Sequence, residues 1–249
     1  MAKRIPGRDV SFIISAWKSL FVCAKKSGSV FILLVFAGLL AFASPTTISA
    51  QPYDFSIARL QYDGGGDWYS DPSSIPNLIN FLRENSAMKV NPDEVRLKPQ
   101  DPELFLHPYL YMTGHGNIRF SETDVQRLRQ YLTNGGFLHA DDNYGMDESF
   151  RREMKKVFPE KEFVELPFDH PIYHIKYDFS NGPPKIHEHD GKPAQGFGLF
   201  HNERLVVFYT YETDLGDGWE DTDVHDDTPE QHRKSLQMGT NIVLYALTH

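Results

Sequence analysis

Two apolar segments that end abruptly in polar residues constrain the fold of this chain more than any other feature. Leu110–Met112 runs into Thr-Gly-His-Gly, and Phe137–Ala140 runs into Asp-Asp-Asn-Tyr-Gly. A helical pattern lies between them, because Ser121 and Asp124 have the spacing of a capping box and Gly135 fits the position after a helix end. This order predicts a strand–helix–strand unit with polar strand ends.

The same alternation of strands and helices continues on both sides of this unit. Apolar periodicity and turn residues delimit the other elements. Strands are predicted at 56–62, 94–97 and 162–166, a hairpin at 197–201 and 204–211, and helices at 74–82, 149–158 and 228–247. Ser74 and Thr228 are the expected N-caps of the first and last of these helices. The sequence therefore predicts a single three-layer α/β domain over 53–249, with a mostly parallel sheet and one antiparallel hairpin.

The first fifty residues have a different composition. Lys25 and Lys26 precede an apolar run at 30–43, and residues 44–50 are small and mostly polar. This order is typical of an export signal, and the run of about 14 residues is shorter than the ~20 that a spanning helix needs. We expect cleavage before Gln51 and export to the periplasm or cell envelope. The alternative is an uncleaved N-terminal membrane anchor.

Charge and cysteine content exclude several partners and chemistries. Residues 51–249 contain 19 Lys and Arg and 33 Asp and Glu, a net charge of −14. Such a surface repels phosphate backbones, so we expect no nucleic acid partner, and membrane contact only through the N-terminal segment. The only cysteine is Cys23. The exported part therefore has no disulfide, thiolate metal site or cysteine nucleophile.

Polar loops follow the predicted strands, and parallel strands bring such loops to one edge of a sheet. We expect five of them to meet there: 63–68, 114–117, 141–144, 168–174 and 212–220. The result would be an acidic, histidine-containing cleft at the carboxyl ends of the strands.

Asp141, Asp142 and His115 are the candidate catalytic residues. Neighbouring carboxylates can act as an acid/base pair or bind a hard metal, and an imidazole between two glycines can carry a proton. Adjacent residues of a strand point in opposite directions, so we expect only one of the two aspartates to face the cleft. The alternative is structural: Asp142 caps the next helix, Asp141 is solvated and His115 is a turn residue.

His187 and His189, together with Asp142, are the candidate metal ligands. In an extended segment, residues two apart lie on the same side, which gives the two imidazoles a chelating geometry. Mixed nitrogen and oxygen ligands suit zinc or manganese. The alternative is a solvated polar loop.

A further group is assigned to substrate binding: Trp68, Asn143, Asp214, Trp219 and Glu220. Carboxylates accept protons from hydroxyl groups, and an indole can stack on the apolar face of a sugar ring. The expected substrate is a glycan or another small polar molecule. The alternative is a folded acidic loop in which Trp219 is the local anchor.

Four motifs carry a family resemblance: Tyr-Met-Thr-Gly-His-Gly (111–116), Leu-Arg-Gln-Tyr-Leu-x-x-Gly-Gly-Phe-Leu-His-Ala-Asp-Asp-Asn (128–143), Pro-Lys-Ile-His-Glu-His (184–189) and Asp-Leu-Gly-Asp-Gly-Trp-Glu (214–220). From residue 53 to residue 249 the chain resembles the bacterial domain of unknown function 4159 family. That family looks like a branch of the class I glutamine amidotransferase-like superfamily, which implies a flavodoxin-like sheet. The catalytic cysteine of glutamine amidotransferases is missing, so glutamine hydrolysis is excluded.

Two classes of function fit these observations. One is a hydrolase that acts on a glycan or small polar substrate with the acidic and histidine residues above. The other is a non-catalytic ligand-binding or assembly module of the cell envelope.

Overall fold

The sheet has seven strands, and five neighbouring strands in it are parallel. The computed structural model describes residues 53–189 and 191–249, and the expectations for residues 1–50 lie outside them. The strand order is β2-β1-β3-β4-β7-β6-β5, with β6 antiparallel to both of its neighbours. The strands are β1 (Ala58–Leu60), β2 (Val95–Leu97), β3 (Tyr109–Met112), β4 (Phe137–Asp141), β5 (Val164–Glu165), β6 (Gln195–His201) and β7 (Arg204–Tyr211).

The five parallel strands lie in the order β2-β1-β3-β4-β7. Numbered among themselves along the chain, they have the order 2-1-3-4-5 of the flavodoxin-like fold. The predicted mostly parallel sheet and the predicted hairpin, β6–β7, are therefore confirmed. In such open sheets, ligands bind beyond the carboxyl ends of the strands. We call this edge of the sheet the rim.

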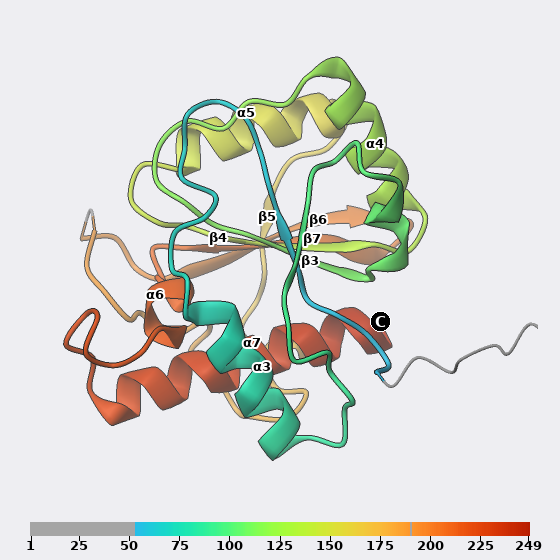
Figure 1. Ribbon diagram of the computed structural model, residues 1–249. Coiled ribbons are helices and arrows are strands. Elements are labelled where there is room, and N and C mark those ends of the chain that lie inside the picture. Colours follow the sequence, from blue (N-terminus) through green and yellow to red (C-terminus); the bar gives the residue numbers. More distant parts are fainter. Residues whose placement is uncertain (1–52, 190) are drawn as a thin grey trace, which may run out of the picture. The chain divides into compact units, whose positions relative to one another are not determined.

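Helices cover both faces of the sheet (Figure 1). One face carries α4 (Glu122–Thr133) and α5 (Asp147–Val157), and the other carries α3 (Ser74–Asn85), α6 (Leu215–Trp219) and α7 (Pro229–Thr248). Each face has its own apolar core, because successive strand residues point to opposite sides. Leu110 and Met112 pack with α4 and α5, whereas Tyr109 and Tyr111 pack with α3 and α7.

Three predicted helix caps can be compared with the structure. Ser121 and Asp124 form the predicted capping box of α4, and Thr228 caps α7. The prediction that Ser74 is the N-cap of α3 is wrong. Helix α3 begins at Ser74 itself, and its hydroxyl group donates to the carbonyl oxygen of Asp71 at 2.7 Å instead of capping the first turn.

The loop at 168–174 does not stay at the rim, which corrects the expectation that five loops meet there. After β5 the chain passes through Pro171–Tyr173, a 3-10 helix that packs against α7. The His170 ring lies 5.3 Å from that of Tyr245, near the end of α7. His174 is held by Asp178 and by the carbonyl oxygen of Phe168. Prolines at 167 and 171 favour this turn, because they cannot continue a ladder of strand hydrogen bonds.

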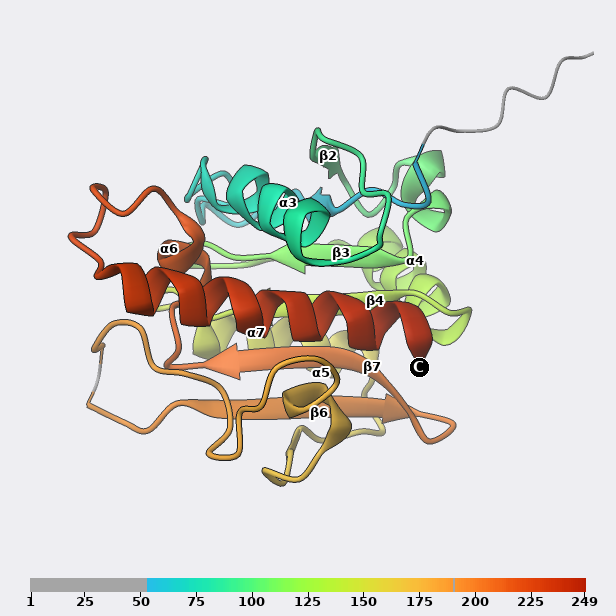
Figure 2. The same cartoon turned by 90° about the horizontal axis from the view of Figure 1, so that it is seen from below.

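Helix α6 is the element that places acidic residues at the rim. Figure 2 shows α6 beside the first turns of α7, on the side to which β3 and β7 point. The loops that follow β1, β4 and β7 meet beneath it. Among the described residues, no helix is both long enough and apolar enough to cross a membrane.

Candidate functional site

Asp141 is the last residue of β4 and holds the turn in front of α6. Its Oδ2 accepts from the backbone NH of Gly216 at 2.6 Å, and its Oδ1 accepts from the hydroxyl groups of Thr210 and Thr213. The side chain is fully buried. Burial raises the pKa of Asp141 to about 7, although these three hydrogen bonds oppose the rise. The structure therefore gives Asp141 a positioning role at the base of the site, and not the predicted contact with a ligand.

Gly216 lets α6 pack closely onto these acidic residues. A Cβ atom at this position would lie 2.3 Å from the hydroxyl oxygen of Tyr111 and 3.0 Å from Asp71 Oδ2. Atoms at such distances would repel each other strongly, so a larger residue would push α6 outward. The glycine thus determines how deep the loop at 212–220 sits.

Asp71 is a buried carboxylate from the loop after β1. The guanidinium group of buried Arg59 donates to the carbonyl oxygens of Ser70 and Asp71, which fixes this loop. Asn143 Nδ2 lies 3.3 Å from Asp71 Oδ2 and 3.4 Å from Asp217 Oδ1, and so links the two carboxylates. Burial, followed by the charges of Asp217 and Glu220, raises the pKa of Asp71 to about 8.

Two predicted metal ligands, His187 and His189, converge on one carboxylate. His189 Nε2 contacts Asp214 Oδ2, and His187 Nδ1 lies 3.4 Å from the same atom. The prediction that both imidazoles lie on one side is therefore confirmed. Asp214 Oδ1 is buried and accepts no hydrogen bond from the described residues. Burial raises the pKa of Asp214, but the contacts with the two imidazoles outweigh this effect and hold the pKa below its ordinary value.

Among the described residues, His187, Asp217 and His225 form a group of three possible metal ligands, and we call them the metal triad. One ligand atom from each lies within 4.8 Å of the other two. Asp217 Oδ2 is 3.5 Å from His187 Nδ1 and 3.7 Å from His225 Nε2. Two ligand atoms bound tetrahedrally at about 2.1 Å from zinc lie about 3.4 Å apart. The two distances from Asp217 are therefore close to those expected around a single ion.

Carboxylates outside the triad contact both of its imidazoles. His187 Nε2 lies 3.0 Å from Asp227 Oδ1, on the side of the ring opposite Asp217. His225 Nε2 lies 3.0 Å from Glu220 Oε2. Metal-binding histidines commonly have a carboxylate on the ring nitrogen that does not bind the metal, and Asp227 has this position at His187. Glu220 instead contacts the same nitrogen of His225 that faces Asp217. Hydrogen bonds to Asp214, Asp217 and Asp227 raise the pKa of His187 to about 10, so without a metal this imidazole is protonated.

The triad is partly open to solvent. The side chain of His187 is 24% exposed, that of His225 is 30% exposed, and that of Asp217 is 12% exposed. Three protein ligands with an open side are typical of catalytic metal sites, whereas structural sites are closed by four.

The other predicted catalytic residues lie at the same rim but outside the triad. Strands β3 and β4 are parallel, so His115 and Asp142 follow their carboxyl ends. His115 contacts Asp67 through its ring and its backbone NH. Asp142 is 3% exposed, and burial raises its pKa to about 7. It lines a pocket that also contains His189. Asp142 and Asp141 therefore face different surroundings, as the strand alternation predicts.

The prediction that Trp219 provides a stacking surface for a sugar is wrong. Trp219 is fully buried, its indole NH donates to the carbonyl oxygen of Ser235 at 2.8 Å, and its ring packs 5.1 Å from that of Tyr111. It anchors α6 to α7. Trp68 is partly buried against the apolar core below α4 and α5, with its ring edge-on to Tyr69. Of the predicted substrate residues, Asp214, Glu220 and Asn143 belong to the acidic cluster around the triad.

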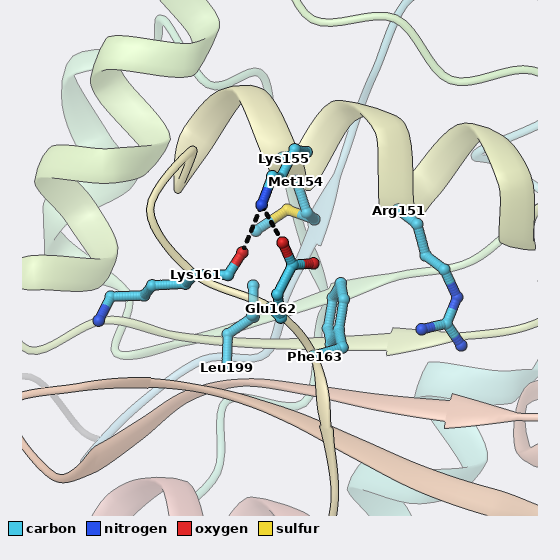
Figure 3. A pocket seen from close by; sticks show the side chains of 7 residues that line it. All are labelled: Arg151, Met154, Lys155, Lys161, Glu162, Phe163 and Leu199. Atoms are coloured by element: carbon cyan, nitrogen blue, oxygen red, sulfur yellow. Dashed lines mark hydrogen bonds and ion pairs between the residues drawn. The ribbon is translucent and has the colours of Figure 1, made fainter.

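A larger hollow of about 320 Å³ lies away from the rim, between α5 and the chain before β5. Figure 3 shows Lys155 reaching down to Glu162 and to the carbonyl oxygen of Lys161. Polar groups that line the hollow thus bond to one another. Its apolar lining residues are Met154, Phe163 and Leu199. This hollow has no connection to the acidic cluster.

Sequence reasoning missed Asp71, Asp217, His225 and Asp227 as site residues. A signal for the last two was available, because the segment Asp-Thr-Asp-Val-His-Asp-Asp (221–227) places a histidine among four acidic residues directly after α6. Nothing in the local sequence marks Asp71. Its role depends on the loop after β1 folding back beneath α6.

Comparison with known families gives one match. A family model described as a domain of unknown function (DUF4159) matches residues 56–247. No curated protein matches the chain.

Proposed function

The chain belongs to the DUF4159 family, whose function is not assigned, and from the rim geometry we propose that it is a divalent-metal-dependent hydrolase. The metal ligands are His187 Nδ1, Asp217 Oδ2 and His225 Nε2. The observation that carries the proposal is the convergence of these three atoms within 4.8 Å on a partly exposed surface. Zinc or manganese suits this mixture of nitrogen and oxygen ligands.

The surroundings of the triad support a cation at this position. Asp71, Asp214 and Glu220 all lie within contact range of the triad or of its partners, so the cluster holds more carboxylates than imidazoles. A buried excess of negative charge is costly unless a cation or protons neutralise it. The buried Asp214 Oδ1, which lacks a donor among the described residues, adds to this demand.

A metal ion held by three protein ligands keeps an open position for water. A divalent ion held by these residues would supply the activation of water that hydrolysis needs at neutral pH. His189 and Asp142, which line the pocket next to Asp214, stand where a polar substrate can be held. The proposed substrate is a glycan or another small polar molecule.

Two further proposals concern the ancestry and location of the protein. The flavodoxin-like strand order supports kinship with the class I glutamine amidotransferase-like superfamily, in a branch without the nucleophilic cysteine. The charged, apolar and small-residue order of residues 1–50 supports export to the periplasm or cell envelope.

A melting scan of chelator-treated protein with zinc, manganese or calcium tests the metal site. A metal at a hundredfold excess over its Kd stabilises the folded state by about 2.7 kcal/mol, or roughly 5–10 °C for a domain of this size. We expect zinc or manganese to give this shift. Asp217→Asn and His225→Ala should each remove most of it. His174→Ala, a histidine outside the triad held by Asp178, is the matched control and should leave it intact.

Hydrolysis of chromogenic glycosides, esters and phosphate esters by the same samples tests the reaction. Activity should vanish with chelation, return with the metal and be absent in Asp217→Asn. Absence of a shift with every metal would contradict the proposal. A metal shift without hydrolysis of any substrate would instead support a non-catalytic module of the cell envelope.

A further inference from the structure

A pocket beside the metal triad has features of a ligand site of its own. It has a volume of about 240 Å³, and its walls include Asp142, Tyr144, His189, Lys192 and Tyr211. Pockets for drug-sized ligands measure about 300–1,000 Å³, so this one has room for a single small ring. We call it the Tyr144 pocket. His189 connects it to the triad, because it contacts the same Asp214 oxygen as His187.

Asp142 supplies a buried acceptor in the wall of this pocket. The residue is 3% exposed, and its Oδ2 accepts a long hydrogen bond of 3.4 Å from the backbone NH of Glu212. Its Oδ1 is buried and has no donor among the described residues. A buried acceptor without a donor destabilises the folded state, because it has lost its hydrogen bonds to water. A ligand that donates a proton to Asp142 Oδ1 would offset that destabilisation.

Tyr144 supplies an exposed aromatic ring at the mouth of the pocket. The residue is 61% exposed, and its ring stands edge-on to His189 at 5.8 Å. Exposed aromatic rings with a polar tip favour ligands that have one apolar face and a polar edge. The structure thus provides at Tyr144 the stacking surface that buried Trp219 cannot offer.

The charged groups around the pocket are of both signs, and several pair with each other. Glu212 Oε2 lies 3.1 Å from Lys185 Nζ, and Asp147 Oδ1 lies 2.6 Å from Arg151 Nε. Lys192 Nζ donates to the hydroxyl group of Tyr211 at 2.7 Å. The carboxyl groups in the wall, which belong to Asp142, Asp147, Glu148 and Glu212, outnumber its two basic groups, so the pocket disfavours an anionic ligand. It offers donors and acceptors together, which suits a neutral ligand with several hydroxyl groups.

We infer that the Tyr144 pocket binds one neutral saccharide unit, with the sugar ring on Tyr144 and a hydroxyl group donating to Asp142 Oδ1. The role of this saccharide as a substrate rests on the proposed function, because the metal triad beside the pocket would carry out the reaction. The binding itself needs only the pocket.

Titration with four monosaccharides that differ in charge tests the inference. Glucose and N-acetylglucosamine are neutral, glucosamine is cationic and glucuronate is anionic, and each is followed by saturation-transfer NMR on the chelated and the zinc-loaded protein. We expect a neutral sugar to bind best. Tyr144→Ala and Asp142→Asn should each weaken its binding by about tenfold or more. Tyr69→Ala, an equally exposed tyrosine in the loop after β1, should have no effect.

Three results would overturn the inference: no binding of either neutral sugar, preference for a charged one, or equal sensitivity to Tyr69→Ala. The melting scans keep this test separate from the proposed function. A rise in melting temperature with metal, but no sugar binding, would contradict the saccharide assignment of the Tyr144 pocket and leave the proposed metal site standing. Sugar binding that depends on Tyr144, without a change of melting temperature with any metal, would contradict the proposed hydrolase. The protein would then be a saccharide-binding module.

Discussion

At the scale of single residues, the site depends on buried carboxylates. Asp141 satisfies three donors, which lie at the end of β7, in the loop that follows it and at the start of α6. A buried donor that loses its acceptor costs more than the average hydrogen bond contributes, because the donor pays its full desolvation. Asp141 is therefore expected to act through the loop that it holds.

Asp141→Ala should destabilise the fold by about 2 kcal/mol or more, because it leaves the donors of Thr213 and Gly216 unsatisfied, whereas the Thr210 hydroxyl group can still donate to the carbonyl oxygen of Ala140. Urea unfolding followed by circular dichroism measures this loss. Asp141→Asn keeps one acceptor oxygen and should lose less. Equal stability of the alanine variant and the natural chain would show that these hydrogen bonds contribute nothing.

The raised pKa of Asp71 gives a prediction about pH. Its pKa in the folded protein is about 8, above the ordinary value of 3.8, so between these pH values the folded state binds more protons than the unfolded state. Asp71 therefore lowers the free energy of unfolding as pH rises from about 4 to 8. In metal-free protein, Asp71→Asn should flatten this decline. Melting temperatures of both proteins at pH 5 and pH 8 measure it. An unchanged slope would show that Asp71 is ionised throughout.

At the scale of elements, α6 is positioned by a contact between one glycine and one tyrosine. The Tyr111 hydroxyl group is buried and has no hydrogen-bond partner among the described residues. It lies where the Cβ of any residue replacing Gly216 would be placed. Removing that hydroxyl group should therefore cost little and should make room above β3.

Gly216→Ala should destabilise the protein by about 1–3 kcal/mol through overpacking, and should weaken the metal shift because α6 carries Asp217. Tyr111→Phe should restore much of both losses in the double variant. A double-mutant cycle of melting temperatures, with and without zinc, measures the coupling. Strictly additive effects would indicate that this contact does not set the depth of α6.

The elements themselves were largely predictable, because periodicity and caps are local. The strand–helix–strand unit from β3 to β4 and the capping boxes of α4 and α7 follow from residues a few positions apart. The loop at 168–174 was not predictable in this way, since its path depends on packing against α7. For the same reason the sequence indicated His187 and His189 but not Asp71, whose partners Asn143 and Asp217 come from distant loops.

At the scale of the whole molecule, the sequence separates a basic N-terminal segment from an acidic domain. The net charge of residues 51–249 is −14, whereas six of the 25 basic residues lie in the first fifty. A protein with this surface repels polyanions and attracts cations, in agreement with the proposed metal site. The acidic residues of the site are thus part of a wider field of the same sign.

Removal of the N-terminal segment gives the last prediction, which one experiment can check by two independent readouts. If the export signal is cleaved, the mature protein begins near Gln51 and contains no thiol, because Cys23 is the only cysteine of the chain. N-terminal sequencing of the protein from the extracytoplasmic fraction should then start near Gln51. Denatured protein treated with a maleimide should keep its mass. An intact N-terminus together with one maleimide adduct, in the membrane fraction, would instead establish an uncleaved anchor.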